Sequence, residues 1–145
     1  MIIVDSGPLI SLLNRDEGRL HGLAQLVIQD NPAEVIVPWP VYTEVDLFLR
    51  GRGHARFAQA LGEAFLRGEL NLAQVTYSEL QVALDLMRRY EKLGVDLPDA
   101  TVMAMTATRG AAAFTWDFRH FRAVVLERGS AIPLVVQEFE TQPRD

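Results

Sequence analysis

Residues 2–9 read Ile-Ile-Val-Asp-Ser-Gly-Pro-Leu, and this stretch decides the fold class. The three β-branched residues Ile2 to Val4 predict a short buried strand. Asp5 is the first polar residue after that strand, and Gly7 and Pro8 mark a tight turn that leads into a helix. The chain therefore opens with a strand, a turn and a helix in close succession.

The same alternation continues along the chain. Val35 to Val37 and Ala112 to Trp116 predict two further short buried strands, and Leu134 to Val136 predicts a last one. Apolar residues at helical spacing predict the helices between them, at 20–28, 41–49, 57–65, 76–94 and 96–110, with a short helical piece after Asp117. Short strands alternating with longer helices predict an α/β fold. We expect a three-layer α/β/α sandwich with a short, mainly parallel central sheet.

The length and composition fit one domain. The chain has 145 residues, of which 49% are hydrophobic and 23% charged, and we assign residues 1–139 to a single domain and 140–145 to a C-terminal tail. The absence of cysteine excludes thiol catalysis and cysteine-bound metals. The N-terminus lacks the basic region and apolar core of a signal peptide, and no apolar run approaches the ~18 residues of a membrane helix. We expect a cytoplasmic protein that does not associate with membranes.

The formal net charge is −5, which argues against a protein that coats nucleic acid through a basic surface. It does not exclude a nuclease, because carboxylates that hold a metal count as negative until the cation binds.

Two acidic residues directly follow predicted strands. Asp5 comes after Ile2 to Val4, and Asp117 comes after Ala112 to Trp116. Ligands of open α/β sheets bind beyond the carboxyl ends of the strands, so both carboxylates are placed where a ligand would sit. The alternative for each acid is that it only caps the helix that follows.

Glu44 lies on an apolar helix face. Helical spacing groups it with Val41, Val45 and Phe48 in the middle of the stripe expected to be buried. An unpaired carboxylate there would cost several kcal/mol, so Glu44 requires a cation or a salt-bridge partner. A buried ion pair with an arginine is the alternative to a metal site.

Asp99 falls in the first turn of a predicted helix. Asp96 is the expected N-cap, because Pro98 stands where a helical N–H is dispensable, and this leaves Asp99 available for chemistry. The carboxylates of Asp5, Glu44, Asp99 and Asp117 would supply the oxygen ligands that Mg²⁺ and Mn²⁺ prefer. Without a metal, like charges would raise their pKa values.

Four segments around these acids resemble the motifs of the PIN-domain family, and within it the VapC-like ribonuclease toxins of type II toxin–antitoxin systems. The motifs appear in family order and span residues 4–121. They are Val4-Asp5-Ser6-Gly7-Pro8-Leu9, Thr43-Glu44-Val45, Leu97-Pro98-Asp99-Ala100 and Thr115-Trp116-Asp117-Phe118-Arg119-His120-Phe121.

The resemblance implies an endoribonuclease that depends on Mg²⁺ or Mn²⁺. Asp5 and Asp99 would bind the metal directly, and Glu44 and Asp117 would bind it directly or through water. The polar positions Ser6 and Thr115 would support these acids by hydrogen bonds. Two positions depart from the common pattern: Gly7 replaces a polar residue found in many members, and Trp116 is bulkier than the usual residue.

The resemblance also implies an RNA substrate, a cognate antitoxin protein and a homodimer. Two basic segments are candidates for holding the RNA backbone, the first with Arg50 and Arg52 and the second with Arg119 and Arg122. Solvated charge is the alternative for both segments. The three histidines, His21, His54 and His120, have no metal-pair spacing and are interpreted as surface or structural residues.

Two other classes of function remain open at this stage. The first is a PIN-fold RNA-binding or assembly module with little or no catalysis. The second is phosphoryl transfer by another α/β family, either a metal-dependent phosphatase or a receiver domain. The phosphatase pattern requires an acid where this chain has Gly7, and the receiver pattern requires a lysine near a late strand, whereas Lys92 lies within a predicted helix.

Overall fold

The computed structural model describes residues 1–143, apart from the side chain of Arg128. Its described part contains a four-stranded sheet in the order β3-β2-β1-β4, with every neighbouring pair parallel. Ile2 pairs with Val35 on one side of β1 and with Ala112 on the other. The strands are β1 Ile2–Val4, β2 Val35–Pro38, β3 Asn71–Ala73 and β4 Ala112–Phe114. The expected parallel sheet is confirmed.

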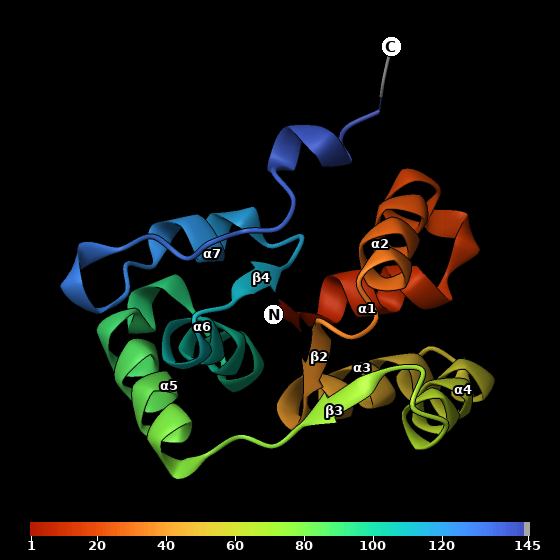
Figure 1. Ribbon diagram of the computed structural model, residues 1–145, viewed down its shortest axis with the longest axis horizontal. Helices are drawn as coiled ribbons and strands as arrows, with labels where there is room; N and C mark the ends of the chain where they lie inside the picture. Colours follow the sequence, from red (N-terminus) through yellow and green to blue (C-terminus); the bar gives the residue numbers. More distant parts are fainter. Residues whose placement is uncertain (144–145) are drawn as a thin grey trace.

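The helices cover both faces of this sheet. They are α1 Ser6–Leu13, α2 Arg19–Asp30, α3 Trp39–Gly51, α4 Ala55–Leu66, α5 Tyr77–Arg89, α6 Leu97–Arg109 and α7 Phe118–Ala123. Figure 1 shows α5 and α6 on one side of the strands and α1, α2 and α4 on the other. Right-handed crossovers explain this, since the chain moves outward from β1 to β3 and then returns past β1 to β4. The three-layer α/β/α arrangement is confirmed.

Local capping fixes two helix starts that the sequence predicts. Thr76 accepts a hydrogen bond from the N–H of Glu79, whose carboxylate accepts one from the N–H of Thr76, so α5 begins with a capping box. Asp96 accepts a hydrogen bond from the N–H of Asp99 and caps α6. The helix expected over 76–94 ends earlier, at Arg89, and a 3-10 turn Glu91–Leu93 completes the segment.

Three segments differ from expectation or extend it. The edge strand β3 was not predicted, because its three residues have neither alternation nor β-branched side chains. Residues 134–136 form one parallel bridge, Ala113 to Leu134, in place of a full strand. Near the C-terminus, Glu138–Thr141 form a 3-10 turn, and Arg144 and Asp145 lie outside the described residues. The boundary of the tail at residue 140 stays a prediction.

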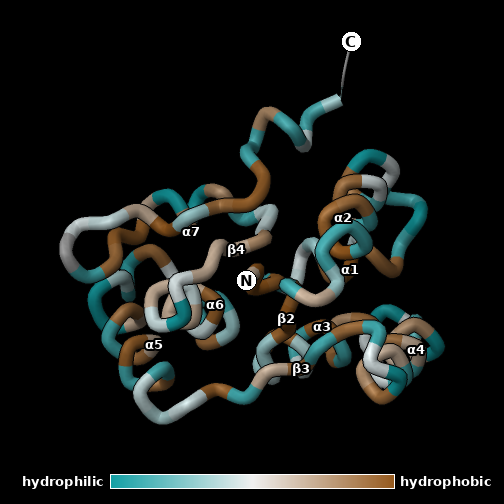
Figure 2. The backbone as a smooth tube through the Cα atoms, viewed as in Figure 1, coloured by the Kyte–Doolittle hydropathy of each residue, from teal (hydrophilic) through white to brown (hydrophobic). Residues whose placement is uncertain are grey.

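The core lies on both faces of the central strands, which are coloured as hydrophobic in Figure 2. Ile3, Val4, Val37 and Phe114 are fully shielded from solvent. No helix among residues 1–143 is long and apolar enough to cross a membrane.

The strand order creates one edge where a site is expected. From β1 the chain proceeds to β2 on one side, and β4 pairs on the other, so β1 and β4 flank the point where the connections reverse direction. Crevices at such points, beyond the carboxyl ends of parallel strands, are where α/β proteins bind ligands. Asp5 follows β1 at this edge, and residues 115–117 follow β4.

Candidate metal centre

Asp5 is buried, with 4% of its surface exposed, between β1 and α1. It occupies the N-cap position of α1 but makes no capping hydrogen bond, so the capping interpretation is wrong for this residue. Its Oδ2 accepts a hydrogen bond from Thr115 Oγ1 at 2.6 Å, across the junction of β1 and β4. Its Oδ1 is also buried and has no hydrogen-bond partner among the described residues. One oxygen of a buried carboxylate is thus left for something else to bind.

Glu44 reaches the same region from α3. The hydroxyl of Ser6 donates a hydrogen bond to Glu44 Oε1, which ties the start of α1 to the middle of α3. Val41 and Val45 beside it are fully buried, but Phe48 is 39% exposed, so the apolar stripe opens to solvent after one turn. Among the described side chains no arginine pairs with Glu44, so they give no support to the alternative of a buried ion pair.

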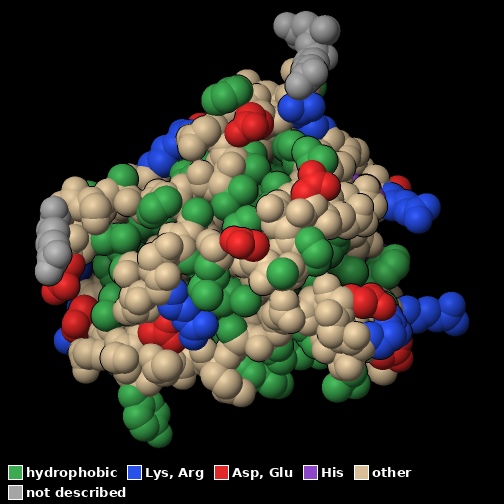
Figure 3. Space-filling view, in the orientation of Figure 1, with side chains coloured by type: hydrophobic (Ala, Val, Ile, Leu, Met, Phe, Trp, Pro, Cys, Tyr) green, Lys and Arg blue, Asp and Glu red, His purple; other side chains and the backbone are tan. Residues whose placement is uncertain are grey.

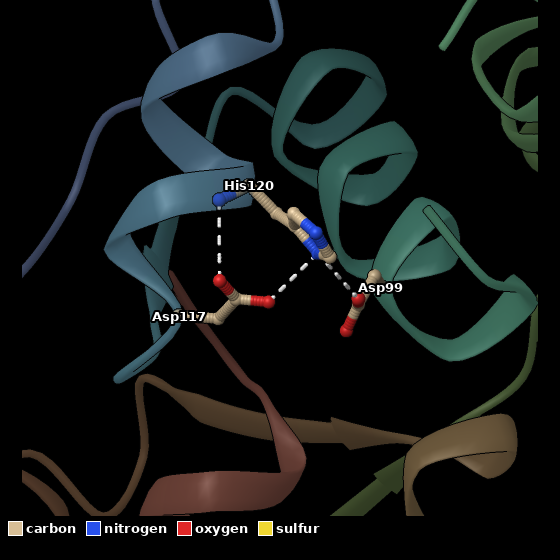
Figure 4. A group of neighbouring side chains, drawn as sticks. All are labelled: Asp99, Asp117 and His120. Carbon is tan, nitrogen blue, oxygen red and sulfur yellow. Dashed lines mark hydrogen bonds and ion pairs between the residues drawn. The ribbon is translucent and has the colours of Figure 1, made fainter. Parts of the chain in front are cut away.

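Asp99, Asp117 and His120 form the second part of the site (Figure 4). Asp99 lies in the first turn of α6, and the other two come from the start of α7. His120 Nδ1 is 2.9 Å from Asp117 Oδ2 and 3.6 Å from Asp99 Oδ2. One ligand atom from each of the three residues falls within 4.8 Å of the other two, a separation suited to a single bound cation.

Asp117 also caps α7, the helix that follows it, which the sequence analysis gave as the alternative to a role in ligand binding. Its Oδ1 accepts a hydrogen bond from the N–H of His120 at 3.1 Å, and its own N–H donates to Thr115 Oγ1 at 3.0 Å. Thr115 therefore contacts both Asp5 and Asp117 and fixes the two strand ends to each other. The second oxygen of Asp117 remains turned toward Asp99 and His120.

The protein disfavours the charged forms of two acids in the cluster, Asp5 and Asp99. Burial raises the pKa of Asp5 to about 6. The hydrogen bonds from the Thr115 hydroxyl and the Ser6 N–H oppose this rise, and the charges of Glu44 and Asp117 add to it. Burial raises the pKa of Asp99 to about 8, with further contributions from Asp5, Asp96, Asp117 and Glu44. The expected direction is confirmed for these two acids, although loss of hydration on burial, not the charge of any one neighbouring acid, is the largest single cause.

These features fit a divalent cation. A cation would satisfy the unpartnered Oδ1 of Asp5 and relieve the repulsion that raises the pKa values of Asp5 and Asp99. Carboxylate oxygens from four elements are the ligands that Mg²⁺ and Mn²⁺ accept. Ser6 donates a hydrogen bond to Glu44 and Thr115 donates one to Asp5, the two positions at which the resemblance implies such support.

Sequence reasoning missed His120, which was interpreted as a surface or structural residue. Its position three residues after Asp117 on a short helix is the signal that could have found it, because residues i and i+3 share a helix face. His21 contacts the carbonyl of Ser11 through Nδ1 at 2.8 Å, and His54 is exposed at the start of α4. Those two histidines occupy structural or surface positions, as expected.

The four candidate arginines differ in their surroundings. Arg50 pairs with Asp46 at 2.9 Å, and Arg52 lies 4.7 Å over the ring of Phe48. In the second segment Arg122 pairs with Glu138 at 2.6 Å, whereas Arg119 is exposed. On the face shown in Figure 3, lysine and arginine side chains lie in separate groups and form no continuous basic patch.

The two departures from the common motif pattern fit each other. A Cβ at Gly7 would lie 2.9 Å from Cδ1 of Trp116, so the ring occupies the space that a side chain would fill. The indole N–H donates to Ser11 Oγ at 2.9 Å and fixes the ring against α1. The large side chain at 116 therefore depends on the glycine at 7.

Comparisons with known proteins agree with this geometry. The PIN domain model matches residues 2–126. Among solved structures, VapC20 of Mycobacterium tuberculosis, described as a sarcin-ricin loop cleaving toxin, is 26% identical, with a TM-score of 0.69 over 83% of this chain and 94% of that chain. VapBC of Salmonella typhimurium, bound to DNA, has a TM-score of 0.67 at 14% identity over 92% of this chain and 95% of the other. VapBC2 of Rickettsia felis, bound to a promoter fragment, has a TM-score of 0.65 at 14% identity over 86% and 93%. Among curated proteins, none matches by sequence.

Proposed function

Since this chain belongs to the PIN domain family, we propose that it is a metal-dependent endoribonuclease and the toxin of a toxin–antitoxin pair. The observation that carries the proposal is the unpartnered, buried Oδ1 of Asp5 in a cluster with Glu44, Asp99 and Asp117. Membership of the family also removes the phosphatase and receiver-domain alternatives.

Each residue of the cluster has a separate task in this proposal. Asp5 and Asp99 hold the divalent cation directly, and Glu44 and Asp117 hold it directly or through water. Thr115 keeps Asp5 and Asp117 at a fixed separation, and Ser6 orients Glu44 by donating a hydrogen bond from its hydroxyl. When bound, Mg²⁺ or Mn²⁺ lowers the pKa of water and neutralises the charge that develops on the phosphoryl group.

Exposed arginines hold the substrate against this acidic site. Arg119 is exposed and is the second residue of α7, two positions after Asp117, so its guanidinium reaches a phosphate beside the scissile bond. Arg122, Arg50 and Arg52 contact the RNA backbone farther along. Such contacts offset the repulsion between RNA and a protein of net charge −5, and they predict cleavage that weakens as salt rises.

An antitoxin protein and a second copy of this chain are the proposed partners, and the cytoplasm is the proposed location. The antitoxin is supported by relatives of the same fold whose solved structures are VapBC or toxin–antitoxin complexes. A bound antitoxin would keep RNA from the site until it is removed.

The test is cleavage of a mixed RNA pool by the purified protein and its Asp5→Asn variant, each with Mg²⁺, Mn²⁺ or EDTA. We expect cleavage only with metal, and a loss in the variant on the order of a hundredfold or more, since one buried group that stabilises the transition state contributes at least that much. The variant also controls for contaminating ribonuclease.

Equal cleavage by both proteins would contradict the assignment of Asp5. RNA binding without cleavage by the wild type, under every metal condition, would favour the binding-module alternative.

A further inference from the structure

We propose that His120 Nδ1 is a ligand of the bound cation, and that the resulting mixed nitrogen–oxygen site prefers Mn²⁺ to Mg²⁺. The inference rests on the proposed function in one respect only, that the acidic cluster binds a divalent cation. It goes beyond that function by adding a residue outside the four acids and by naming the ion.

The separations between the three side chains fit one coordination sphere (Figure 4). Nδ1 of His120 is 2.9 Å from Asp117 Oδ2 and 3.6 Å from Asp99 Oδ2. Adjacent ligands of an octahedral ion with bonds of about 2.1 Å lie ~3 Å apart. The imidazole nitrogen and one oxygen from each aspartate can therefore share an ion without rebuilding either helix.

The nitrogen faces only the carboxylates of Asp117 and Asp99 among the described residues, and it pairs with them only when the ring is protonated. His120 Nδ1 is buried and makes no hydrogen bond, although Asp117 Oδ2 is 2.9 Å away. The distance suits a hydrogen bond, so the contact fails in its angle. A histidine that served only to hold Asp117 would direct its N–H at that oxygen. Buried polar atoms are nearly always satisfied, and an unsatisfied one indicates an absent ion or water.

A second unpartnered atom, on Asp5, independently indicates that a cation binds in this cluster. Asp5 is 96% buried, since 4% of its surface is exposed, and its Oδ1 also has no hydrogen-bond partner among the described side chains and backbone. The charge of Asp5 is among the causes that raise the pKa of Asp99, so these two side chains are close enough to interact. Two unsatisfied atoms from different elements, one oxygen and one nitrogen, border the same cluster.

The nitrogen changes which ion the site favours. Mg²⁺ takes oxygen ligands and releases its waters reluctantly, whereas imidazole suits first-row transition ions. A site of carboxylates alone would discriminate weakly between Mg²⁺ and Mn²⁺. Replacing one oxygen by an imidazole nitrogen adds a ligand that Mn²⁺ accepts more readily, so the ratio of the two affinities reports whether His120 binds.

The test uses a variant that exchanges the nitrogen for an oxygen. His120→Asn retains a polar group near the position of Nδ1 and keeps the backbone N–H that donates to Asp117. We expect the ratio of Mn²⁺ to Mg²⁺ affinity, measured by calorimetry, to fall by about tenfold, the lower end of what changes around metal ligands produce. His54→Asn, on an exposed histidine at the start of α4, is the matched control and should leave the ratio unchanged.

Pulsed electron paramagnetic resonance supplies a direct readout that needs no catalysis. With Mn²⁺ bound to protein carrying ¹⁵N-labelled histidine, we expect a nitrogen coupling in the wild type and in His54→Asn, and none in His120→Asn. Bound Mn²⁺ without nitrogen coupling in the wild type would overturn the inference. An unchanged affinity ratio in His120→Asn would overturn it as well.

The same samples separate this inference from the proposed function. Nitrogen-coupled Mn²⁺ in a protein that cleaves no RNA would support the ligand and contradict the nuclease. Metal-dependent cleavage with no histidine coupling would support the nuclease and contradict the ligand.

Discussion

Glu79 on α5 and Asp99 on α6 lie on neighbouring helices, yet the protein stabilises the charged form of Glu79 and disfavours the charged form of Asp99. Both carboxylate oxygens of Glu79 accept hydrogen bonds from Arg109, Oε2 from Nε at 2.8 Å and Oε1 from Nη2 at 3.0 Å. The hydrogen bonds from Arg109 lower the pKa of Glu79 to about 2, whereas burial among other acids raises the pKa of Asp99 to about 8. One carboxylate is satisfied by the protein itself, and the other is left for a ligand.

The difference separates a stabilising group from a functional one. Glu79 also accepts from Thr108 Oγ1 at 2.8 Å and from the N–H of Thr76, so its charge joins the start of α5 to the end of α6. Asp99 pairs with no arginine or lysine among the described side chains, and the nearest ring nitrogen is Nδ1 of His120, at 3.6 Å. Buried acids whose pKa is strongly raised in a crevice are typical of functional sites, because the fold gives up stability to keep them there.

The largest effect on stability is expected from breaking the ion pair between Glu79 and Arg109. Glu79→Gln leaves Arg109 partly buried without its carboxylate and should lower the free energy of unfolding by about 3 kcal/mol. For a chain of this size the melting temperature should fall by roughly 6–12 °C, measured by calorimetry at pH 7. Since the pKa of Glu79 is lowered from 4.5 to about 2, its contribution is present above pH 4.5 and is lost as the pH falls toward 2.

The control is Glu63→Gln, which removes an exposed carboxylate 3.8 Å from Arg67. That change should stay within about 0.5 kcal/mol, as is usual for surface pairs. A loss of similar size in both variants would contradict the view that Glu79 is a special case.

Glu79 also shows how far the sequence predicts such a group. The spacing Thr76-Tyr77-Ser78-Glu79 predicts the capping box because both partners lie within one helical turn. Arg109 lies 30 residues away on another helix, and no local pattern connects it to Glu79. The interaction that sets the pKa of Glu79 is thus tertiary, and only the structure reveals it.

The candidate site likewise combines groups that local sequence patterns predict with one that only the structure reveals. The four acids were predicted because strand ends and helix faces place them by local rules, and the parallel sheet brings Asp5 and Asp117 to one edge. His120 was not predicted, because the direction of its ring depends on how α7 packs beside α6. The edge strand β3 was missed because pairing with β2, rather than residue preference, makes it a strand.

At Asp99, in contrast, removing the carboxylate should stabilise the protein when no metal is bound. Asp99→Asn removes a carboxylate whose ionisation the fold opposes, so in EDTA at pH 8 it should raise stability by about 1–2 kcal/mol, measured by chemical denaturation. The pKa is raised from 3.8 to about 8, so the stability of the wild type is fully present below pH 3.8 and is lost as the pH rises through 8. The gain from Asp99→Asn should therefore vanish near pH 4.

Asp85→Asn provides the matched control, because Asp85 is an exposed aspartate that pairs with Arg88 at 3.2 Å on the surface of α5. It should change stability little at either pH. A gain at Asp99 that is the same at pH 4 and pH 8, or a loss at pH 8, would show that burial of charge does not distinguish this site from Glu79.

The smallest effect concerns the packing that holds the unbalanced acids in place. Gly7→Ala puts a methyl group 2.9 Å from Cδ1 of Trp116, a ring fixed by its hydrogen bond to Ser11. Alanine within a helix gains ~0.5–1 kcal/mol over glycine, while overpacking costs ~1–3 kcal/mol, so the net change should be a loss of about 1 kcal/mol. Gly22→Ala in α2 meets no atom within 4 Å and should show only the gain. In thermal unfolding with EDTA, the melting temperature should therefore fall in Gly7→Ala and rise in Gly22→Ala.

Because Trp116 directly precedes Asp117, displacement of its ring should also weaken Mn²⁺ binding in Gly7→Ala but not in Gly22→Ala. Equal stabilisation by both changes would mean that the ring moves freely, and that the contact between α1 and residue 116 does not position the acidic site.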